Sequence, residues 1–431
     1  MSSQNPALKK VAIVGGVRIP FCRSGTSYRK CSNFDLLSTA VKGLVRKFEL
    51  DGVRLGDASM GALLSHSTDW NLTREVILES GLSPETPGFN VQRACGTSLE
   101  AAINVANKIS LGQIDSGIVG GTDTNSDVPI AYHRDFARRL VQFTQAKSVG
   151  QKLGAFSGFR LGELKPHIPG VVEPRTGLSM GQHCELMAQE WGITREAQDE
   201  LAYQSHHRAS QAYDNDFYKD LVLPFQGVDR DNNLRSDTSL EKLAKLKTVF
   251  ERSDKGTLTA GNSTPMTDGA SSVLLASEEW AKERGLPVLA YLVTGEVAAV
   301  DFVGGDGLLM APALAVPRML QRLGLTLQDF DFYEIHEAFA AQVLCTLKAW
   351  ESEAFCKAKL GRPQALGSID RSRMNVVGGS LALGHPFSAT GGRIIATLAK
   401  LLADKGAGRG LISVCTAGGM GVTAVLERPE R

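Results

Sequence analysis

The sequence of 431 residues is 43 % hydrophobic and carries a formal net charge of +1. This length suggests two or three structural units, and the balanced charge argues against nucleic acid as a partner. No run of about 18 apolar residues is present, so we expect no membrane-spanning helix.

The first part of the chain alternates predicted strands with predicted helices. Residues 1–10 are polar and lack the apolar core of a signal peptide, so we expect no secretory signal. Apolar runs and helical periodicity predict strands over 10–16, 60–64 and 116–119 and helices over 34–48, 71–80 and 99–109. This alternation is typical of an α/β protein with a parallel, doubly wound sheet.

A cysteine stands at one of the predicted turns from strand to helix. Cys95 follows Val91 and precedes the helical pattern, so the helix dipole is expected to lower its thiol pKa. Gly96 and Thr97 are expected to leave room for a ligand beside the sulfur. The alternative is a small buried hydrophobic residue, the commoner role of a lone cysteine.

The seven cysteines are scattered along the chain and include no CxxC pair. Unpaired cysteines of this kind predict neither a disulfide framework nor a metal site. They favour a reducing compartment, so we expect a cytoplasmic enzyme.

Residues 128–250 differ from the preceding residues in their sequence pattern and are interpreted as an insertion in the first α/β unit. Within it, residues 132–169 combine many Lys and Arg with interleaved aromatic residues. Such a stretch could contact a membrane surface, a partner or an anionic ligand, or could be a solvated helical insertion. Residues 180–213 are strongly helical, 240–250 predict a short helix, and 257–264 with 268–275 predict a return to strands and tight turns.

From residue 281 the order of elements starts again. The predicted strands are 288–292, 329–334 and 412–415, and a helix is predicted over 389–402. The turn at 375–386 takes the place of the Cys95 turn. We therefore expect two duplicated halves, residues 1–127 plus 251–280 and residues 281–431, with a ligand site between their matching turns.

Three late motifs can act together with Cys95. They are His385 in a Gly-His-Pro turn, Cys415 before a Gly-rich loop, and His336 in His-Glu-Ala-Phe-Ala. A thiol beside an imidazole can form a covalent acyl intermediate, and a second thiol can move a proton at carbon. Backbone N–H groups in Gly-rich turns can bind an oxyanion. These residues predict an enzyme that makes or breaks a carbon–carbon bond in a thioester.

The chain resembles the thiolase family over nearly its whole length. The segments that carry the resemblance are 17–21, 92–98, 120–123, 261–270, 336–340, 375–393 and 415–421. The resemblance implies a layered αβαβα fold, a helical loop-domain insertion, and transfer of acyl groups between coenzyme A thioesters. Coenzyme A would be a substrate, with no permanently bound cofactor, and the chain would form a homodimer or a larger assembly.

The resemblance also assigns roles to residues. It implies that Cys95 is acylated, His385 activates it, and Cys415 is the acid and base at carbon. Backbone N–H groups of Cys95 and Ala417 would hold the thioester oxyanion, although a Gly is usual at position 417. His336 stands where Asn more often holds a water in a second oxyanion hole.

His336 and the insertion resemble the branch of β-subunits from fatty-acid oxidation trifunctional complexes. That branch implies medium or long acyl chains and docking of 132–169 to a hydratase/dehydrogenase α-subunit or a membrane. Ser179, where short-chain enzymes often have His, weakens a reading confined to short chains. Candidate coenzyme A contacts are Arg235 near the adenine and Ser263, Thr264 and Phe339 along the pantetheine.

The main prediction is a 3-ketoacyl-CoA thiolase of fatty-acid β-oxidation, and three alternatives stay open. One is an acetyl-CoA acetyltransferase that condenses short chains. Another is a ketoacyl-synthase-type condensing enzyme with His336 and His385 as its two histidines, in which Cys415 would be unnecessary. The last is a non-catalytic lipid carrier or scaffold, against which the complete set of Cys95, His385 and Cys415 argues.

Overall fold

A computed structural model describes residues 8–430, so most of the segment predicted to lack a signal sequence lies outside the described residues. Within this range the strands form one ten-stranded sheet of order β4-β3-β5-β6-β1-β7-β10-β9-β8, with β2 paired to β6. The strands are β1 (Val11–Arg18), β2 (Cys22–Arg23), β3 (Asp57–Met60), β4 (Phe89–Asn90), β5 (Ser116–Asp123), β6 (Thr267–Ser277), β7 (Ala290–Ala299), β8 (Phe332–Ile335), β9 (Gly408–Thr416) and β10 (Met420–Arg428).

The sheet confirms the predicted duplication. Outward from its centre the strands run β1, β6, β5, β3 on one side and β7, β10, β9, β8 on the other. Each half contributes an outer parallel pair, β3 with β5 and β8 with β9. The expected parallel sheet is wrong for the centre, where β6, β1, β7 and β10 pair antiparallel. The reason for β10 is that a short loop, not a crossover helix, joins it to β9.

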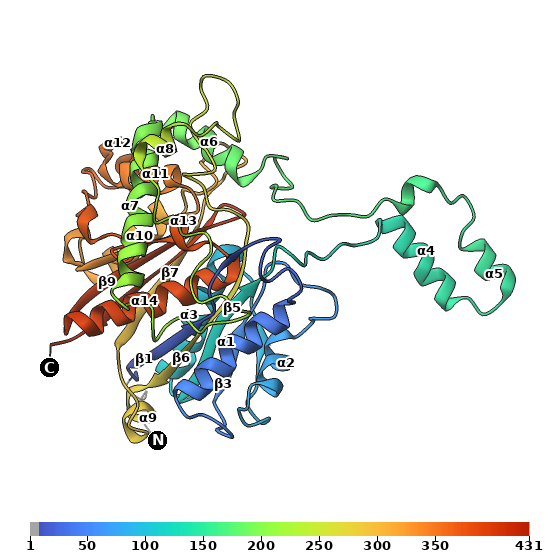
Figure 1. The fold of residues 1–431 in the computed structure, drawn as a ribbon, viewed down its shortest axis with the longest axis horizontal. Coiled ribbons are helices and arrows are strands. Elements are labelled where there is room, and N and C mark those ends of the chain that lie inside the picture. The colour runs from blue at the N-terminus through green and yellow to red at the C-terminus, as the bar shows by residue number, and fades with distance from the viewer. Residues whose placement is uncertain (1–7, 431) are drawn as a thin grey trace.

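Helices cover both faces of the sheet in layers (Figure 1). Helices α3 (Thr97–Ser110) and α14 (Thr390–Lys405) lie against each other and contact strands of both halves. Outer helices α1 (Asn33–Lys47) and α2 (Leu72–Glu79) cover the first half, and α10 (Pro312–Leu323) and α11 (Ala340–Glu351) belong to the core of the second. Short helices α9 (Glu278–Glu283), α12 (Glu353–Leu360) and α13 (Ser380–Leu383) complete these layers.

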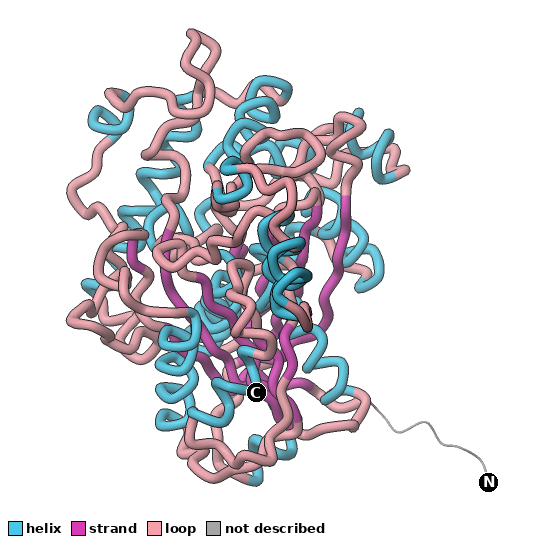
Figure 2. Tube along the Cα trace, turned by 90° about the vertical axis from the view of Figure 1, so that its right-hand side faces the viewer, coloured by secondary structure: helices cyan, strands magenta, loops and turns pink. Residues whose placement is uncertain are grey.

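Residues 130–172, called the arm here, project from this body on two extended tethers (Figures 1 and 2). The arm contains α4 (Arg134–Gln145) and α5 (Val149–Gly154). Its rings pack on one another, with Phe136 and Phe143 against Phe156, and Arg139 pairs with Glu163 at 2.6 Å. The arm therefore has a small core of its own, while much of its apolar surface stays exposed.

The rest of the insertion returns to the body. Helices α6 (Met180–Glu190) and α7 (Arg195–Asp214) confirm the helical stretch predicted over 180–213. Both helices contact α11. Helix α8 (Leu240–Ala244) is shorter than the predicted 240–250, because Thr248 instead pairs with Thr259 in an isolated bridge. Residues 257–264 therefore form turns with isolated bridges at Thr259 and Ser263, and the strand expected over 268–275 is confirmed as β6 (Thr267–Ser277).

The strand predicted at 60–64 is also displaced. The observed strand, β3, ends at Met60. The next residue, Gly61, passes so close to the Val91 backbone that a Cβ on Gly61 would lie 1.9 Å from the Val91 carbonyl oxygen. This close approach aligns the end of β3 with the segment that leads into Cys95. Among the described residues, no helix is long and apolar enough to cross a membrane.

Candidate active site

Cys95 lies in a single 3₁₀ turn, Ala94–Gly96, directly before α3, so its predicted place at a helix N-terminus is confirmed. Ala94 has φ 44°, a left-handed conformation that costs energy for a residue with a side chain. The expected role of Gly96 is wrong. A Cβ on Gly96 would lie 2.7 Å from Val422, so this glycine allows close packing on β10 and does not leave room for a ligand.

The predicted fall in the pKa of Cys95 is also wrong. Burial raises the pKa of this thiol to about 12, and backbone N–H groups of Ala417 and Cys95 offset only part of the effect. Desolvation therefore outweighs the stabilisation expected from the helix N-terminus. The resting sulfur keeps its proton and needs a base.

His385 supplies an imidazole beside that thiol. The Gly-His-Pro turn is fixed by Gly384, whose φ of 100° favours glycine, and by the His385 N–H, which donates to Thr267 Oγ1 at 2.8 Å. The ring Nδ1 lies 2.6 Å from Thr390 Oγ1, while Nε2 is buried without a hydrogen-bond partner among the described residues. Burial and the nearby Arg393 lower the pKa of His385 to about 3, so its ring is neutral.

His336 lies against His385, with ring centroids 4.1 Å apart. It follows β8, and its N–H donates to Ser413 O on β9 at 2.8 Å. Its Nδ1 is 2.8 Å from Ser380 Oγ, and its buried Nε2 has no partner within residues 8–430. Burial, His385 and Arg393 lower the pKa of His336 well below its usual value, so this ring is neutral too.

The structure brings the predicted nucleophile and both histidines together. Cys95 Sγ and one ring nitrogen each of His336 and His385 lie within 4.8 Å of one another. Three such atoms could also approach a soft metal ion, although no metal site was predicted. The high thiol pKa of Cys95 opposes that use, because zinc binds the thiolate.

Cys415 completes the cluster from the second half. It lies near the end of β9 and is buried, and both burial and the neighbouring Cys95 raise the pKa of its thiol well above the usual value. The loop to β10 consists of Ala417 and two glycines with positive φ. The Ala417 N–H lies close enough to the Cys95 thiol to lower its pKa, so this N–H is beside the place where an oxyanion on an attached acyl carbon would form.

Four buried residues of the site were missed by sequence reasoning. Glu173, at the base of the arm, accepts the Gly418 N–H at 2.7 Å and so holds the loop that carries Ala417. Ser380, Thr390 and Arg393 hold the two histidines. Ser380, Thr390 and Arg393 lie inside the segment 375–393 that carries the family resemblance, so that segment could have pointed to them. No sequence pattern could have pointed to Glu173.

The candidate coenzyme A contacts lie outside this cluster. Arg235 lines a pocket of about 330 Å³ together with Arg23, Lys242 and His206. Asp237 also lines the pocket and pairs with Lys242 at 2.7 Å, so Arg23 and Arg235 are the cations that make it suitable for a phosphorylated ligand.

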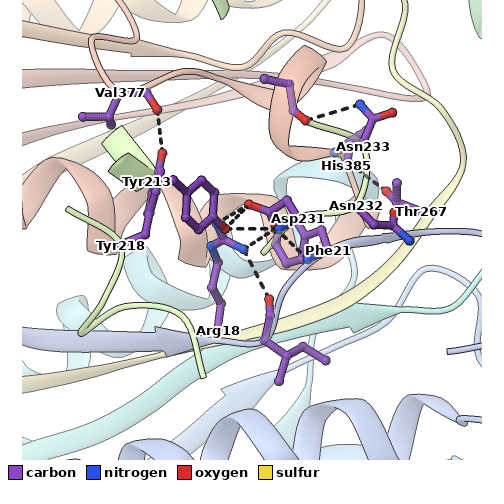
Figure 3. Close-up of polar contacts among 12 residues, drawn as sticks. Arg18, Phe21, Tyr213, Tyr218, Asp231, Asn232, Asn233, Thr267, Val377 and His385 are labelled. Carbon is purple, nitrogen blue, oxygen red and sulfur yellow. Dashed lines mark hydrogen bonds and ion pairs between the residues drawn. The ribbon is translucent and has the colours of Figure 1, made fainter. Parts of the chain in front are cut away.

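A buried network fixes the loop that carries Arg235 (Figure 3). Arg18 donates to both oxygens of Asp231, at 2.6 and 2.7 Å, and the pair is almost completely buried. Asn233 Nδ2 donates to Leu381 O at 2.8 Å, next to Ser380. The pocket is therefore tied to the helix α13 that leads to His385.

The other three candidates lie together between the pocket and the histidines. Ser263 forms an isolated bridge with Phe339, the phenylalanine of the His-Glu-Ala-Phe-Ala motif, and the Ser263 hydroxyl is buried without a described partner. The Thr264 hydroxyl donates to Ala338 O at 3.0 Å. Phe339 is buried against Phe250, with ring centroids 5.9 Å apart. Ser179 caps α6 through the Gln182 N–H.

Comparison with known proteins agrees with this geometry. The family model for the N-terminal domain of thiolases matches residues 11–279, and that for the C-terminal domain matches residues 286–428. A 3-ketoacyl-CoA thiolase of Shewanella baltica is 41 % identical over 425 residues, covering 97 % of both chains. One of Yersinia pestis is 41 % identical over 424 residues, also covering 97 % of both chains.

Solved structures resemble the whole chain as well. Human mitochondrial 3-ketoacyl-CoA thiolase in complex with CoA matches with a TM-score of 0.81 and 28 % identity, covering 98 % of each chain. Acetyl-CoA acetyltransferase of Bacillus anthracis matches with a TM-score of 0.80 and 30 % identity, covering 98 % of this chain and 99 % of that one. By sequence and by fold, this chain belongs to the thiolase family.

Proposed function

We propose that this protein is a 3-ketoacyl-CoA thiolase that cleaves its substrate with CoA into acetyl-CoA and a shortened acyl-CoA. The observation that carries the proposal is the meeting of two thiols and two neutral imidazoles in one buried site. Cys95 Sγ lies within 4.8 Å of one ring nitrogen of each histidine, the Ala417 N–H contacts the Cys95 thiol, and Cys415 is a near neighbour of Cys95. The names of the relatives support the same substrate class.

The first half of the reaction forms an acyl-enzyme. As Cys95 Sγ attacks the 3-keto carbon, His385 Nε2 takes the thiol proton. This transfer is uphill in the resting site, because burial raises the pKa of the thiol and lowers that of the imidazole. The proton therefore moves as the sulfur–carbon bond forms, and the N–H groups of Cys95 and Ala417 bind the new oxyanion.

Cleavage then releases acetyl-CoA. The bond between C2 and C3 breaks, and its electrons leave as the enolate of acetyl-CoA, which Cys415 protonates at C2. The raised pKa of the Cys415 thiol means that it enters the cycle with this proton available. CoA then binds, gives its thiol proton to the Cys415 thiolate, and takes the acyl group from Cys95, which recovers its proton from His385.

CoA is used here as a substrate, with no permanently bound cofactor. The pocket at Arg235 is the proposed site for its nucleotide, and Ser263, Thr264 and Phe339 are proposed to line the path to Cys95. A related human thiolase structure holds CoA, which supports this use of the fold. Residues 128–250 would then form an inserted loop domain between the two thiolase halves.

The arm is proposed as a docking element. The arm projects away from the body and carries many cationic residues together with exposed apolar residues such as Leu153 and Leu161. A hydratase/dehydrogenase α-subunit is the proposed partner, and an anionic membrane surface is the alternative occupant. The catalytic body is proposed to work as a homodimer or larger assembly in the cytoplasm.

The test is a thiolysis assay with purified protein over 3-ketoacyl-CoA chains of 4 to 16 carbons. We expect activity that rises beyond about C8; activity confined to C4 would instead favour the short-chain acetyltransferase. Cys95→Ala should form no covalent acyl adduct by mass spectrometry, whereas the control Cys356→Ala, in α12, should acylate normally. An adduct on Cys95→Ala would remove this nucleophile from the mechanism.

The role of Cys415 separates a thiolase from a ketoacyl-synthase-type enzyme. Cys415→Ser should still acylate at Cys95 yet lose condensation of two acetyl-CoA molecules. Condensation near the wild-type rate would show that no thiol proton carrier is needed and would favour the synthase. Inactivity of the wild type at every chain length, unrelieved by an α-subunit, would favour the scaffold.

A further inference from the structure

A buried chain of polar groups leads from Arg393 to the ring of His336. Arg393 Nη2 donates to Ser380 Oγ at 3.1 Å, and Ser380 Oγ lies 2.8 Å from His336 Nδ1. Arg393 and Ser380 are at most 2 % exposed, and the Glu334 carboxylate lies 3.9 Å from the other end of the guanidinium.

The direction of each hydrogen bond in this chain can be worked out from donor chemistry. A guanidinium has only donors, so Ser380 Oγ must accept from Arg393. The serine hydroxyl then has one proton to give, and His336 Nδ1 is the acceptor within reach among the described residues. A fully buried hydroxyl without an acceptor would be costly. His336 Nδ1 is therefore the unprotonated nitrogen.

A neutral imidazole carries one proton, so the proton of His336 must be on Nε2. This is the nitrogen that faces the site, buried and without a described partner. We propose that Ser380 and Arg393 are positioning residues that hold His336 in its Nε2–H tautomer and so make it an oxyanion donor. The inference rests on the proposed function, because the oxyanion belongs to the thiolase reaction.

His385 contrasts with His336 in the group that holds it. Its Nδ1 contacts Thr390 Oγ1, and no guanidinium donates to that hydroxyl. Thr390 is therefore free to accept the Nδ1 proton, which leaves Nε2 with a lone pair for the Cys95 thiol. The two adjacent rings can thus take opposite tautomers. His336 is a donor at Nε2, because its Ser380 partner already accepts a hydrogen bond from Arg393. His385 is a base at Nε2, because its Thr390 partner can accept the Nδ1 proton.

The geometry also indicates which oxyanion His336 serves. The Ala417 and Cys95 N–H groups lie at the Cys95 sulfur, so they bind oxygen on the carbon attached to it. The enolate oxygen of the departing acetyl-CoA is a second oxyanion, and within the cluster of Cys95, His336 and His385 the unpartnered donor is His336 Nε2–H. Loss of that donor should impair cleavage of the carbon–carbon bond but spare exchange of an acyl group between Cys95 and CoA.

The test compares Ser380→Ala with Ser59→Ala, a buried serine in β3 whose hydroxyl has no described partner. For Ser380→Ala we expect kcat for thiolysis to fall about 10- to 100-fold with KM within about twofold, because one oxyanion donor is no longer held. Exchange of labelled CoA into acetyl-CoA should stay near the wild-type rate. Ser59→Ala should match the wild type, and Ser380→Thr, which keeps the hydroxyl, should recover most of kcat.

A second measurement reads the tautomer directly. In protein labelled with ¹⁵N-histidine, long-range ¹⁵N–¹H spectra distinguish protonated from unprotonated ring nitrogens, and a His336→Asn sample assigns the signals. Wild type should show a proton on His336 Nε2, and Ser380→Ala should show a mixture. A proton on Nδ1 in the wild type would overturn the inference, as would equal losses of thiolysis and acyl exchange in Ser380→Ala.

The two proposals fail in different ways. A wild type without any 3-ketoacyl-CoA cleavage contradicts the proposed function, yet the tautomer spectrum still tests the hydrogen-bond chain. An active wild type whose Ser380→Ala variant behaves like Ser59→Ala contradicts the inference alone.

Discussion

Buried histidines of this protein are held neutral, and this makes its stability sensitive to acid. His206 is one that lies outside the catalytic cluster. It is 6 % exposed, and its Nδ1 accepts the Arg235 N–H at 3.1 Å. Burial, with the charges of Arg235 and Arg23, lowers the pKa of His206 to about 4. Protonation would add an unfavourable buried charge and break the bond to the Arg235 loop.

This pKa shift predicts a pH dependence. An unfolded histidine has a pKa of about 6.5, so between pH 6.5 and 4 the unfolded chain binds more protons than the folded one. Acidification through this window should therefore cost the wild type about 3 kcal/mol of unfolding free energy relative to His206→Gln. The buried carboxyls Asp123 and Glu334, whose pKa values are raised, act in the opposite direction and cancel in this comparison.

Urea unfolding of both proteins at several pH values measures this difference. At pH 7.5 neither the folded nor the unfolded state gains a proton at this site. The difference in unfolding free energy between wild type and His206→Gln at this pH therefore gives the effect of the substitution itself. A gap that stays constant down to pH 4 would contradict the neutral state of His206.

At the scale of elements, the site depends on the short loop between β9 and β10. Gly418 and Gly419 have φ of 76° and 70°, which lets the chain reverse directly after Ala417. Glu173 crosses from the base of the arm to accept the Gly418 N–H. A carboxylate that accepts a backbone N–H forms one of the stronger hydrogen bonds in proteins. The loop that carries the proposed oxyanion donor is thus held at Gly418 by a residue 245 positions earlier in the chain.

Removal of this carboxylate should loosen the loop and misplace the Ala417 N–H. We expect Glu173→Ala to lower kcat for thiolysis about 10-fold, with a smaller change in KM, because a misplaced donor weakens transition-state binding most. Glu173→Gln keeps an acceptor oxygen and should retain most of the activity. Steady-state kinetics of the wild type, Glu173→Ala and Glu173→Gln test this prediction. Equal activity in all three proteins would show that Glu173 does not position the Ala417 N–H.

At the scale of the whole molecule, the duplicated halves and the arm have separate duties. The halves bring Cys95 from one side and His336, His385 and Cys415 from the other into a single buried cluster. The arm leaves this body between β5 and β6 and packs on itself. Its tethers meet at Ala131 and His167, which exchange two backbone hydrogen bonds of 3.0 and 2.7 Å.

That pairing allows the arm to be removed with little disturbance. A two-residue Asn-Gly turn fits a hydrogen-bonded antiparallel pair, so it can replace residues 132–166. We expect the shortened protein to keep its melting temperature and its C4 thiolysis, and to lose binding to the α-subunit in pull-down assays. Retained α-subunit binding with lost binding to anionic vesicles would assign the arm to the membrane instead, and loss of C4 activity would contradict its separate role.

The sequence by itself determined the family and the duplicated fold, and it predicted the four side chains that the structure brings close together. Each half repeats the same order of apolar runs, and each functional side chain follows a Gly-rich or strand-end signal, as at Cys95, His385 and Cys415. Such features are local, because turn chemistry and periodicity depend on neighbours in the chain.

Only the tertiary structure decided the protonation states and the antiparallel centre of the sheet. The pKa of Cys95 was expected to fall, yet burial raises it, because desolvation depends on the whole surrounding core. Glu173 acts through a loop distant in sequence, so no local pattern marks it, whereas Ser380 and Arg393 lie in the segment 375–393 but reach His336 only in the folded chain. Local periodicity likewise cannot tell whether β6 and β10 run parallel or antiparallel, because long-range pairing decides strand direction.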